Sequence, residues 1–191
     1  MRSGELLCNW KRQNSQPAAA AGANAFFTEP YDRGTENMIT TPQIIQTTVQ
    51  IAAVIRLTVP RSEIQTVMGP GIGEVMEAVK AQGIGPVGPW FAHHLTLNPA
   101  TFDLEISVPV SARVMPVGRV MPGEWPALKM VRTVMHGSYE GLGNAWVEFT
   151  HWINANGHVT GADLYECYTV GPESSPDPAN WRTELSKTLI G

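Results

Sequence analysis

The stretch LYECYTV, residues 164–170, carries a single carboxylate in the middle of an apolar run. Read as a strand, it places Glu166 and Tyr168 on one face and Cys167 on the other. Removing an unpaired carboxylate from water is costly, so Glu166 needs a compensating partner. Three kinds of partner are possible: a cationic ligand, a solvated sheet edge, or one of Arg113, Arg132 and Arg182.

Other site chemistries have weaker support. The pair His93–His94 alternates across a strand, so the two side chains cannot hold one metal ion together. The stretch YEGLGNAW has too few glycines at the required spacing for a dinucleotide fingerprint. There is no G-x-S-x-G nucleophile elbow. We therefore expect neither a metal nor a cofactor.

Composition narrows the classes of function. The 191 residues suffice for one domain with a sizeable core, and 13 basic against 17 acidic residues give a net charge of −4. This balance argues against a nucleic-acid partner. No apolar run is long enough for a transmembrane helix. The two cysteines, Cys8 and Cys167, are expected to be reduced thiols in a cytoplasmic protein. Residues 1–37 lack a core-forming pattern, so we expect a disordered leader, with Met38 a possible natural start.

The first half of the remaining chain predicts one strand, one helix and two further strands. The strand at 44–59 is rich in β-branched residues, and Ser62 is the expected N-cap of the helix that follows. The GPG sequence at 69–71 should interrupt or kink that helix, which ends at Gly83. The two strands are 89–97 and 101–110, the second with strict alternation of apolar and polar residues.

The second half repeats this order after a Gly/Pro-rich joint at 116–126. Its expected elements are a strand at 127–137, a helix at 139–157, a strand at 162–170, a loop at 172–178 and a strand at 181–190. A shift of 74 residues lays Ala92 over Glu166 and His94 over Tyr168. We therefore predict an α+β fold of two duplicated strand-helix-strand-strand modules with pseudo-twofold symmetry, one antiparallel sheet, two main helices and a ligand cleft between the modules.

The span 42–190 resembles the GyrI-like small-molecule-binding domain, the effector-binding module of AraC-type and MerR-type bacterial regulators. The matching stretches are IAAVIRLTVP, GIGPVGPWFAHH, FDLEISVPV, HGSYEGLGNAW and, above all, LYECYTVGP followed by SSPDPANWRTEL. The domain boundaries are accordingly expected at 1–37 for the leader and 38–191 for the effector-binding domain. Nothing before residue 38 suits a helix-turn-helix, so we expect a stand-alone form that binds neither DNA nor membrane and possibly forms a homodimer.

The resemblance implies binding of a bulky, lipophilic, often cationic small molecule, with Glu166 left unpaired by the protein and facing the ligand. A cation there would meet both a carboxylate and aromatic faces. The candidate ligand-binding residues are Glu166, Tyr168, Trp90, Phe91, His94, Tyr139, Trp146 and Trp181, although helical aromatics such as Trp146 are more often core.

Two alternative functions remain open. One is a hydrolase of electrophilic lipophilic compounds in which Glu166 acts with Tyr139 or Tyr168 as an acid–base pair, with burial raising the Glu166 pKa. The other is a regulator that acts through protein–protein contact, as a gyrase inhibitor would.

Overall fold

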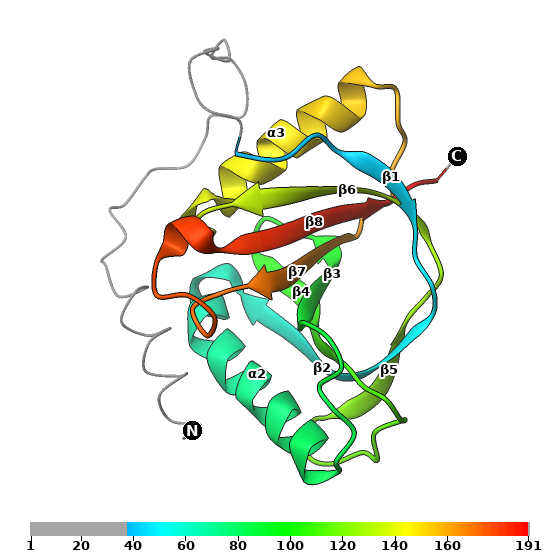
Figure 1. Cartoon of the computed structure of the whole chain (residues 1–191), viewed down its shortest axis with the longest axis vertical. Coiled ribbons are helices and arrows are strands. Elements are labelled where there is room, and N and C mark those ends of the chain that lie inside the picture. The colour runs from blue at the N-terminus through cyan, green and yellow to red at the C-terminus, as the bar shows by residue number, and fades with distance from the viewer. Residues whose placement is uncertain (1–37, 191) are drawn as a thin grey trace.

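The computed structural model describes residues 38–190 as an eight-stranded antiparallel sheet with two helices (Figure 1). The predicted α+β class is confirmed, while the expected leader at 1–37 lies outside the described residues. The helices are α2 (Ile64–Ala81) and α3 (Leu142–Ala155). The strands are β1 (Gln43–Gln46), β2 (Gln50–Pro60), β3 (Phe91–Leu97), β4 (Thr101–Pro109), β5 (Met121–Trp125), β6 (Lys129–His136), β7 (Leu164–Val170) and β8 (Arg182–Thr188).

The sheet must curl, because its order is β1-β6-β8-β7-β3-β4-β2-β5 and yet only residues 47–49 join β1 to β2. In a flat sheet these two strands would lie about 29 Å apart, six spacings of roughly 4.8 Å. A link of that length spans at most about 14 Å. Residues 126–128 impose the same constraint between β5 and β6. Figure 1 shows the chain running on from β1 round to β2.

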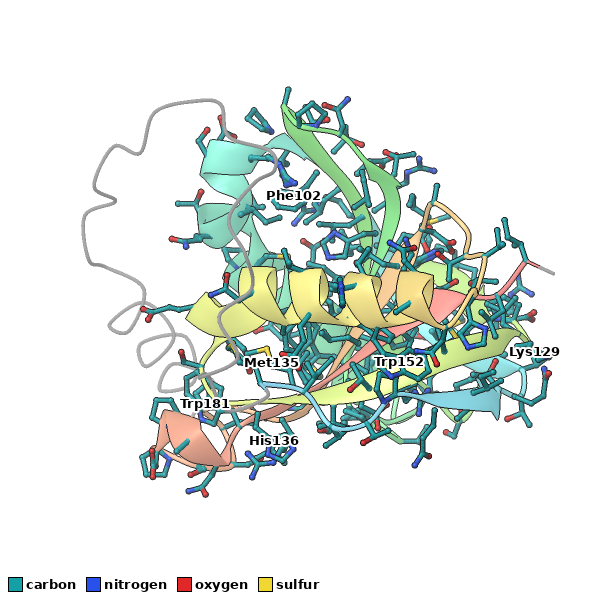
Figure 2. All side chains as sticks on the ribbon, turned by 90° about the horizontal axis from the view of Figure 1, so that it is seen from above. Phe102, Lys129, Met135, His136, Trp152 and Trp181 are labelled. Carbon is teal, nitrogen blue, oxygen red and sulfur yellow. The ribbon has the colours of Figure 1, made fainter. Side chains whose placement is uncertain are left out.

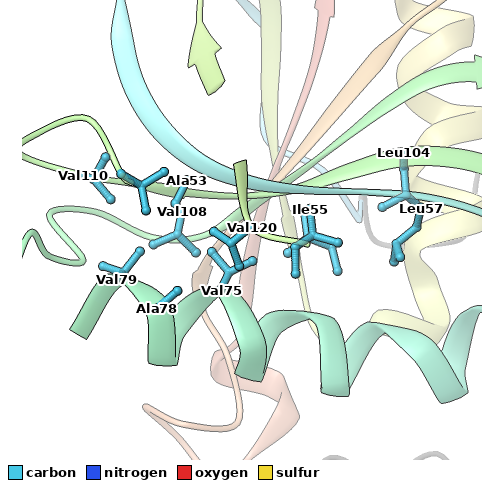
Figure 3. Packing of buried hydrophobic residues seen from close by; sticks show 12 residues of the cluster. Ala53, Ile55, Leu57, Val75, Ala78, Val79, Leu104, Val108, Val110 and Val120 are labelled. Atoms are coloured by element: carbon cyan, nitrogen blue, oxygen red, sulfur yellow. The ribbon is translucent and has the colours of Figure 1, made fainter. Parts of the chain in front are cut away.

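Helix α2 covers β2 and β4 and forms the larger core with them (Figure 3). Val75 and Val79 on the helix pack against Ile55 and Val108, and all four side chains are fully buried. Gly71 lies so near the sheet that a Cβ there would come within 2.6 Å of Ile106 Cδ1. This close approach explains why a helix breaker stands in the middle of α2.

Helix α3 covers β6 and β8 and forms a second core. The helix presents one apolar stripe to the sheet, since Ala145, Phe149 and Ile153 are buried and Leu142 and Trp146 pack beside them. Met135 of β6 lies beneath this helix (Figure 2). Both helices occupy the same side of the sheet, which we call the helix face; the other side is the opposite face. No helix within residues 38–190 is both long and apolar enough to cross a membrane.

The two halves of the sheet mirror each other in strand order. From the central pair outward, the order is β3, β4, β2 on one side and β7, β8, β6 on the other. Each half thus contains the expected strand, helix, strand and strand, with one helix on the helix face. This order is the one that two modules would produce, and an origin by duplication stays a prediction.

Several local expectations are wrong. The strand expected at 44–59 is broken at 47–49, where the chain crosses from one end of the sheet to the other. The segment expected as a joint contains β5, whose edge position tolerates Pro122. Helix α2 runs through Pro70 without the expected interruption, and Ser62 lies in a 3-10 turn and does not cap α2. In β5, pairing with β2 overrides the local signal.

Candidate functional site

The candidate site is built on the central strands β3 and β7, which pair in antiparallel register with Ala92 opposite Glu166. Alternation along the two strands sends Ala92, His94, Glu166 and Tyr168 toward the helix face. Alanine has no side chain beyond Cβ, so the position opposite Glu166 leaves room for larger neighbours. The pairing therefore places the carboxylate at the centre of the helix face.

Three side chains donate or share hydrogen bonds with the Glu166 carboxylate. Trp146 Nε1 of α3 donates to Oε1 at 2.7 Å, and the Tyr168 hydroxyl donates to Oε2 at 2.7 Å. His94 Nε2 lies 3.3 Å from Oε2. Glu166 as a whole is only 8% exposed. The expectation that the protein leaves this carboxylate unpaired is wrong, because a buried carboxylate requires such bonds.

The arginine alternatives for this partner are also wrong. Arg132 Nη1 forms an ion pair of 3.0 Å with Glu184, and Arg182 donates to the backbone carbonyls of Ala179 and Trp181. Arg113 forms no ion pair within residues 38–190 and lies in an exposed irregular segment between β4 and β5. The sequence could not decide this, since it does not show which face of the sheet each arginine occupies.

The Glu166 pKa is lowered, contrary to the expectation that burial would raise it. Desolvation is the largest single influence and raises the pKa, but it is outweighed by the combined effect of His94, Trp146 and Tyr168. The same contact raises the pKa of Tyr168, whose hydroxyl is both buried and next to the carboxylate. The site therefore holds a negative charge in a buried setting, with a protonated tyrosine beside it.

Aromatic rings extend outward from the carboxylate. Trp90 stacks on Tyr168 at 4.0 Å and 12°, and Tyr139 meets Tyr168 edge-on at 5.3 Å. Trp181 lies 4.8 Å from Tyr139, at the end of the molecule near the 3-10 turn Pro178–Asn180 (Figure 2). Trp90, Tyr139 and Trp146 are partly exposed, whereas Tyr168 and Trp181 are buried. The cluster thus has a solvent-facing side made of three rings.

Phe91 does not belong to the aromatic cluster around Glu166. Phe91 pairs with Cys167 on the opposite face and packs 4.5 Å from Trp125, so it cannot share a cleft with Glu166. Conversely, sequence reasoning missed Phe102 of β4, whose ring lies edge-on to His94 at 5.7 Å. The strict alternation of β4 already placed Phe102 on the apolar face, but only the β3–β4 pairing brings it next to His94.

Of the two acid–base pairs proposed from the sequence, the structure assembles Glu166 with Tyr168, whose hydroxyl donates to Oε2 at 2.7 Å. Tyr139 meets the ring of Tyr168 edge-on and forms no hydrogen bond with Glu166 within residues 38–190. Burial also raises the pKa of Tyr139. A carboxylate with a lowered pKa is a weaker base than an ordinary one.

Solved structures show the same fold at low identity. The EcmrR C-terminal domain has a TM-score of 0.68 and 23% identity, covering 78% of this chain and 97% of that domain. EcmrR in its complex with DNA gives 0.69 and 23%, covering 80% of this chain but only 57% of the EcmrR chain. SAV2435 bound to tetraphenylphosphonium gives 0.57 and 17%, covering 80% and 95%. These likenesses establish the fold.

Family assignment comes from the sequence match. No curated protein is similar enough to match the chain. The family model for the GyrI-like small molecule binding domain matches residues 40–186, which is well over half of the chain and runs from before β1 into β8. The chain therefore belongs to the GyrI-like small molecule binding domain family.

Proposed function

We propose that this GyrI-like domain binds bulky, lipophilic cations on its helix face, at Glu166. The observation that carries the proposal is a carboxylate with a lowered pKa, 8% exposed, set among aromatic rings. Coulomb attraction strengthens as water is excluded. Each well-placed ring can add up to about 2 kcal/mol for a desolvated cation.

The three partly exposed rings indicate how a cation would approach. Tyr168 and His94 hold Oε2 from within the sheet, whereas Trp146 reaches Oε1 from α3. A quaternary cation has no hydrogen to donate, so it does not compete for these bonds. It would pack against Trp90, Tyr139 and Trp146, whose side chains would move apart to admit it. At that position the charge of Glu166 would attract it at short range.

One structural neighbour supports the proposal of a cationic ligand. SAV2435, which shares the fold, was solved with tetraphenylphosphonium, a cation of this class. The EcmrR chain extends well beyond the region matched here, and its complex contains DNA. For the present chain we propose the binding step alone, with a receptor or drug-sequestering role as its context.

Two ions of matched shape test the proposal. Tetraphenylphosphonium and tetraphenylborate differ mainly in the sign of charge, and binding of each can be followed by tryptophan fluorescence or calorimetry. Wild type should prefer the phosphonium. Glu166→Gln should weaken phosphonium binding by roughly 2–4 kcal/mol, about thirty- to a thousandfold. The same substitution should also reduce the difference in affinity between the two ions.

Glu124→Gln provides the control, because it removes the same charge from an exposed position on the edge strand β5. Its affinity for tetraphenylphosphonium should stay within about twofold of wild type, since exposed charges are well screened. If Glu166→Gln bound the phosphonium as tightly as Glu124→Gln does, the proposed site would be wrong.

A further inference from the structure

A cavity of about 370 Å³ opens on the opposite face of the sheet, away from Glu166. It lies where the curled sheet brings the link after β1 toward the segment before β3. Its volume falls within the range of small-molecule sites. The lining residues used below are Val87, Phe91, Trp125, Arg132 and Cys167, joined by polar side chains from Gln46 to Gln50.

The apolar wall of this cavity is built from aromatic rings. The rings of Phe91 and Trp125 lie 4.5 Å apart with their planes tilted by 47°, and Trp125 stacks on Tyr165 at 5.1 Å and 5°. Phe91, Tyr165 and Cys167 are all buried, in the cluster that fills the inside of the curl. Aromatic rings packed in this way suit contact with the ring of an aromatic molecule.

Two side chains of the wall have unused donors. The indole N–H of Trp125 is buried, and within residues 38–190 it has no hydrogen-bond acceptor. Arg132 uses Nη1 for Glu184 and Nε for Ser186, at 3.0 and 3.3 Å, and no bond to its Nη2 is formed within the same span. Indole and guanidinium groups can only donate. A buried donor without an acceptor is costly, so a small turn of the Trp125 ring that brings its N–H to an incoming oxygen would relieve that cost.

The lining contains one cation and no carboxylate. Burial raises the pKa of the Cys167 thiol to about 12, with Glu184 adding to the shift and Arg132 opposing it, so Cys167 stays neutral. Charge therefore differs between the two sides of β7. The helix face presents the Glu166 carboxylate. The cavity presents the Trp125 indole and the Arg132 guanidinium, which is ion-paired with Glu184.

We propose that this cavity is a second small-molecule site, separate from Glu166, that takes compact aromatic molecules carrying a carboxylate. The ring system would lie against Phe91 and Trp125, and the carboxylate oxygens would accept from the Trp125 indole and the Arg132 guanidinium. Glu166 and Cys167 are consecutive on β7 and point to opposite faces, so the sheet itself separates the two sites.

Titration of the full chain with 2-naphthoate tests the proposal, by calorimetry or by naphthyl fluorescence. Two variants act on the cavity in different ways. Trp125→Phe keeps a ring and removes the N–H, and should weaken binding five- to tenfold. Val87→Trp, at a lining residue that is 54% exposed, should obstruct the cavity and weaken binding at least tenfold. Glu166→Gln should leave the affinity within twofold.

Two results would overturn the inference. One is no binding of 2-naphthoate to wild type at millimolar concentration. The other is an affinity for 2-naphthoate that changes by no more than twofold in both Trp125→Phe and Val87→Trp. This result includes the case in which only Glu166→Gln changes the affinity. Because Val87 is a surface residue and Trp125→Phe changes no exposed charge, at least one folded variant should be available for the test.

Discussion

Glu166 and Cys167 are neighbours on one strand, equally buried at 8% and 7% exposure, and their ionisation is shifted in opposite senses. Burial alone would raise both pKa values, because it disfavours any anion. The Glu166 carboxylate nevertheless has a lowered pKa, while that of the Cys167 thiol rises to about 12. The two faces of β7 therefore differ in what surrounds a buried acid.

Hydrogen-bond partners account for the difference. The carboxylate meets Trp146, Tyr168 and His94, which together outweigh desolvation. The thiol faces Glu184, which disfavours a second anion, and Arg132 offsets this only in part. The helix face is thus arranged to keep a negative charge on Glu166, whereas the opposite face keeps the Cys167 thiol neutral beside the Glu184–Arg132 ion pair.

The largest expected effect concerns the reactivity of Cys167. A shift from 9.0 to about 12 lowers the thiolate fraction near pH 8 by roughly a thousandfold, and alkylation requires the thiolate. Iodoacetamide should therefore modify Cys167 about a thousandfold more slowly than a free thiol, measured by mass spectrometry in the Cys8→Ser variant. The same variant in urea should react at the normal rate. Rapid modification of the folded protein would show that the opposite face does not suppress the thiolate.

Replacing Glu166 by leucine should have the next largest effect. Three donors would lose their acceptor in a buried setting, so we expect the free energy of unfolding to fall by about 2–4 kcal/mol. Glu166→Gln keeps an acceptor oxygen and should cost about 1–2 kcal/mol. Urea denaturation of wild type and both variants measures these losses. A fully stable leucine variant would mean that the donors find other partners.

Matched tryptophan substitutions compare the two faces directly. Trp146→Phe and Trp125→Phe make the same chemical change, but only Trp146 donates a hydrogen bond, to Glu166. Trp146→Phe should therefore reduce the unfolding free energy by about 1–2 kcal/mol more than Trp125→Phe. Urea denaturation of both variants measures the difference. Equal losses would show that the Trp146 bond contributes no more than ring packing.

The smallest expected effect is a dependence on pH. The folded-state pKa of Glu166 lies below its usual value of 4.5, so the unfolded chain binds more protons as pH falls. The stability that this carboxylate contributes is full above pH 4.5 and is lost as pH falls through the folded-state pKa. The difference in unfolding free energy between wild type and Glu166→Gln should shrink accordingly. A difference that grows on acidification would contradict the lowered pKa.

Periodicity predicted the elements well where one face of each is buried. The stripe Ala145, Phe149 and Ile153 identified α3, and the alternation around Glu166 placed that residue on the face of Tyr168. Local sequence patterns failed to predict the strand β5, and they predicted a helix cap at Ser62 that does not form. In β5, pairing with β2 stabilises a segment rich in proline and glycine. At Ser62, a 3-10 turn displaced the expected cap.

The sequence by itself determined that Glu166 shares a strand face with Tyr168 and opposes Cys167, because side chains alternate along any strand. It also determined an α+β fold with two amphipathic helices. Only the tertiary structure decided that Trp146, His94 and Tyr168 bond the carboxylate, that Phe91 lies across the sheet, and that a cavity forms beside Trp125. These features depend on strand order and on the curl that two short links impose, and neither is encoded in local periodicity.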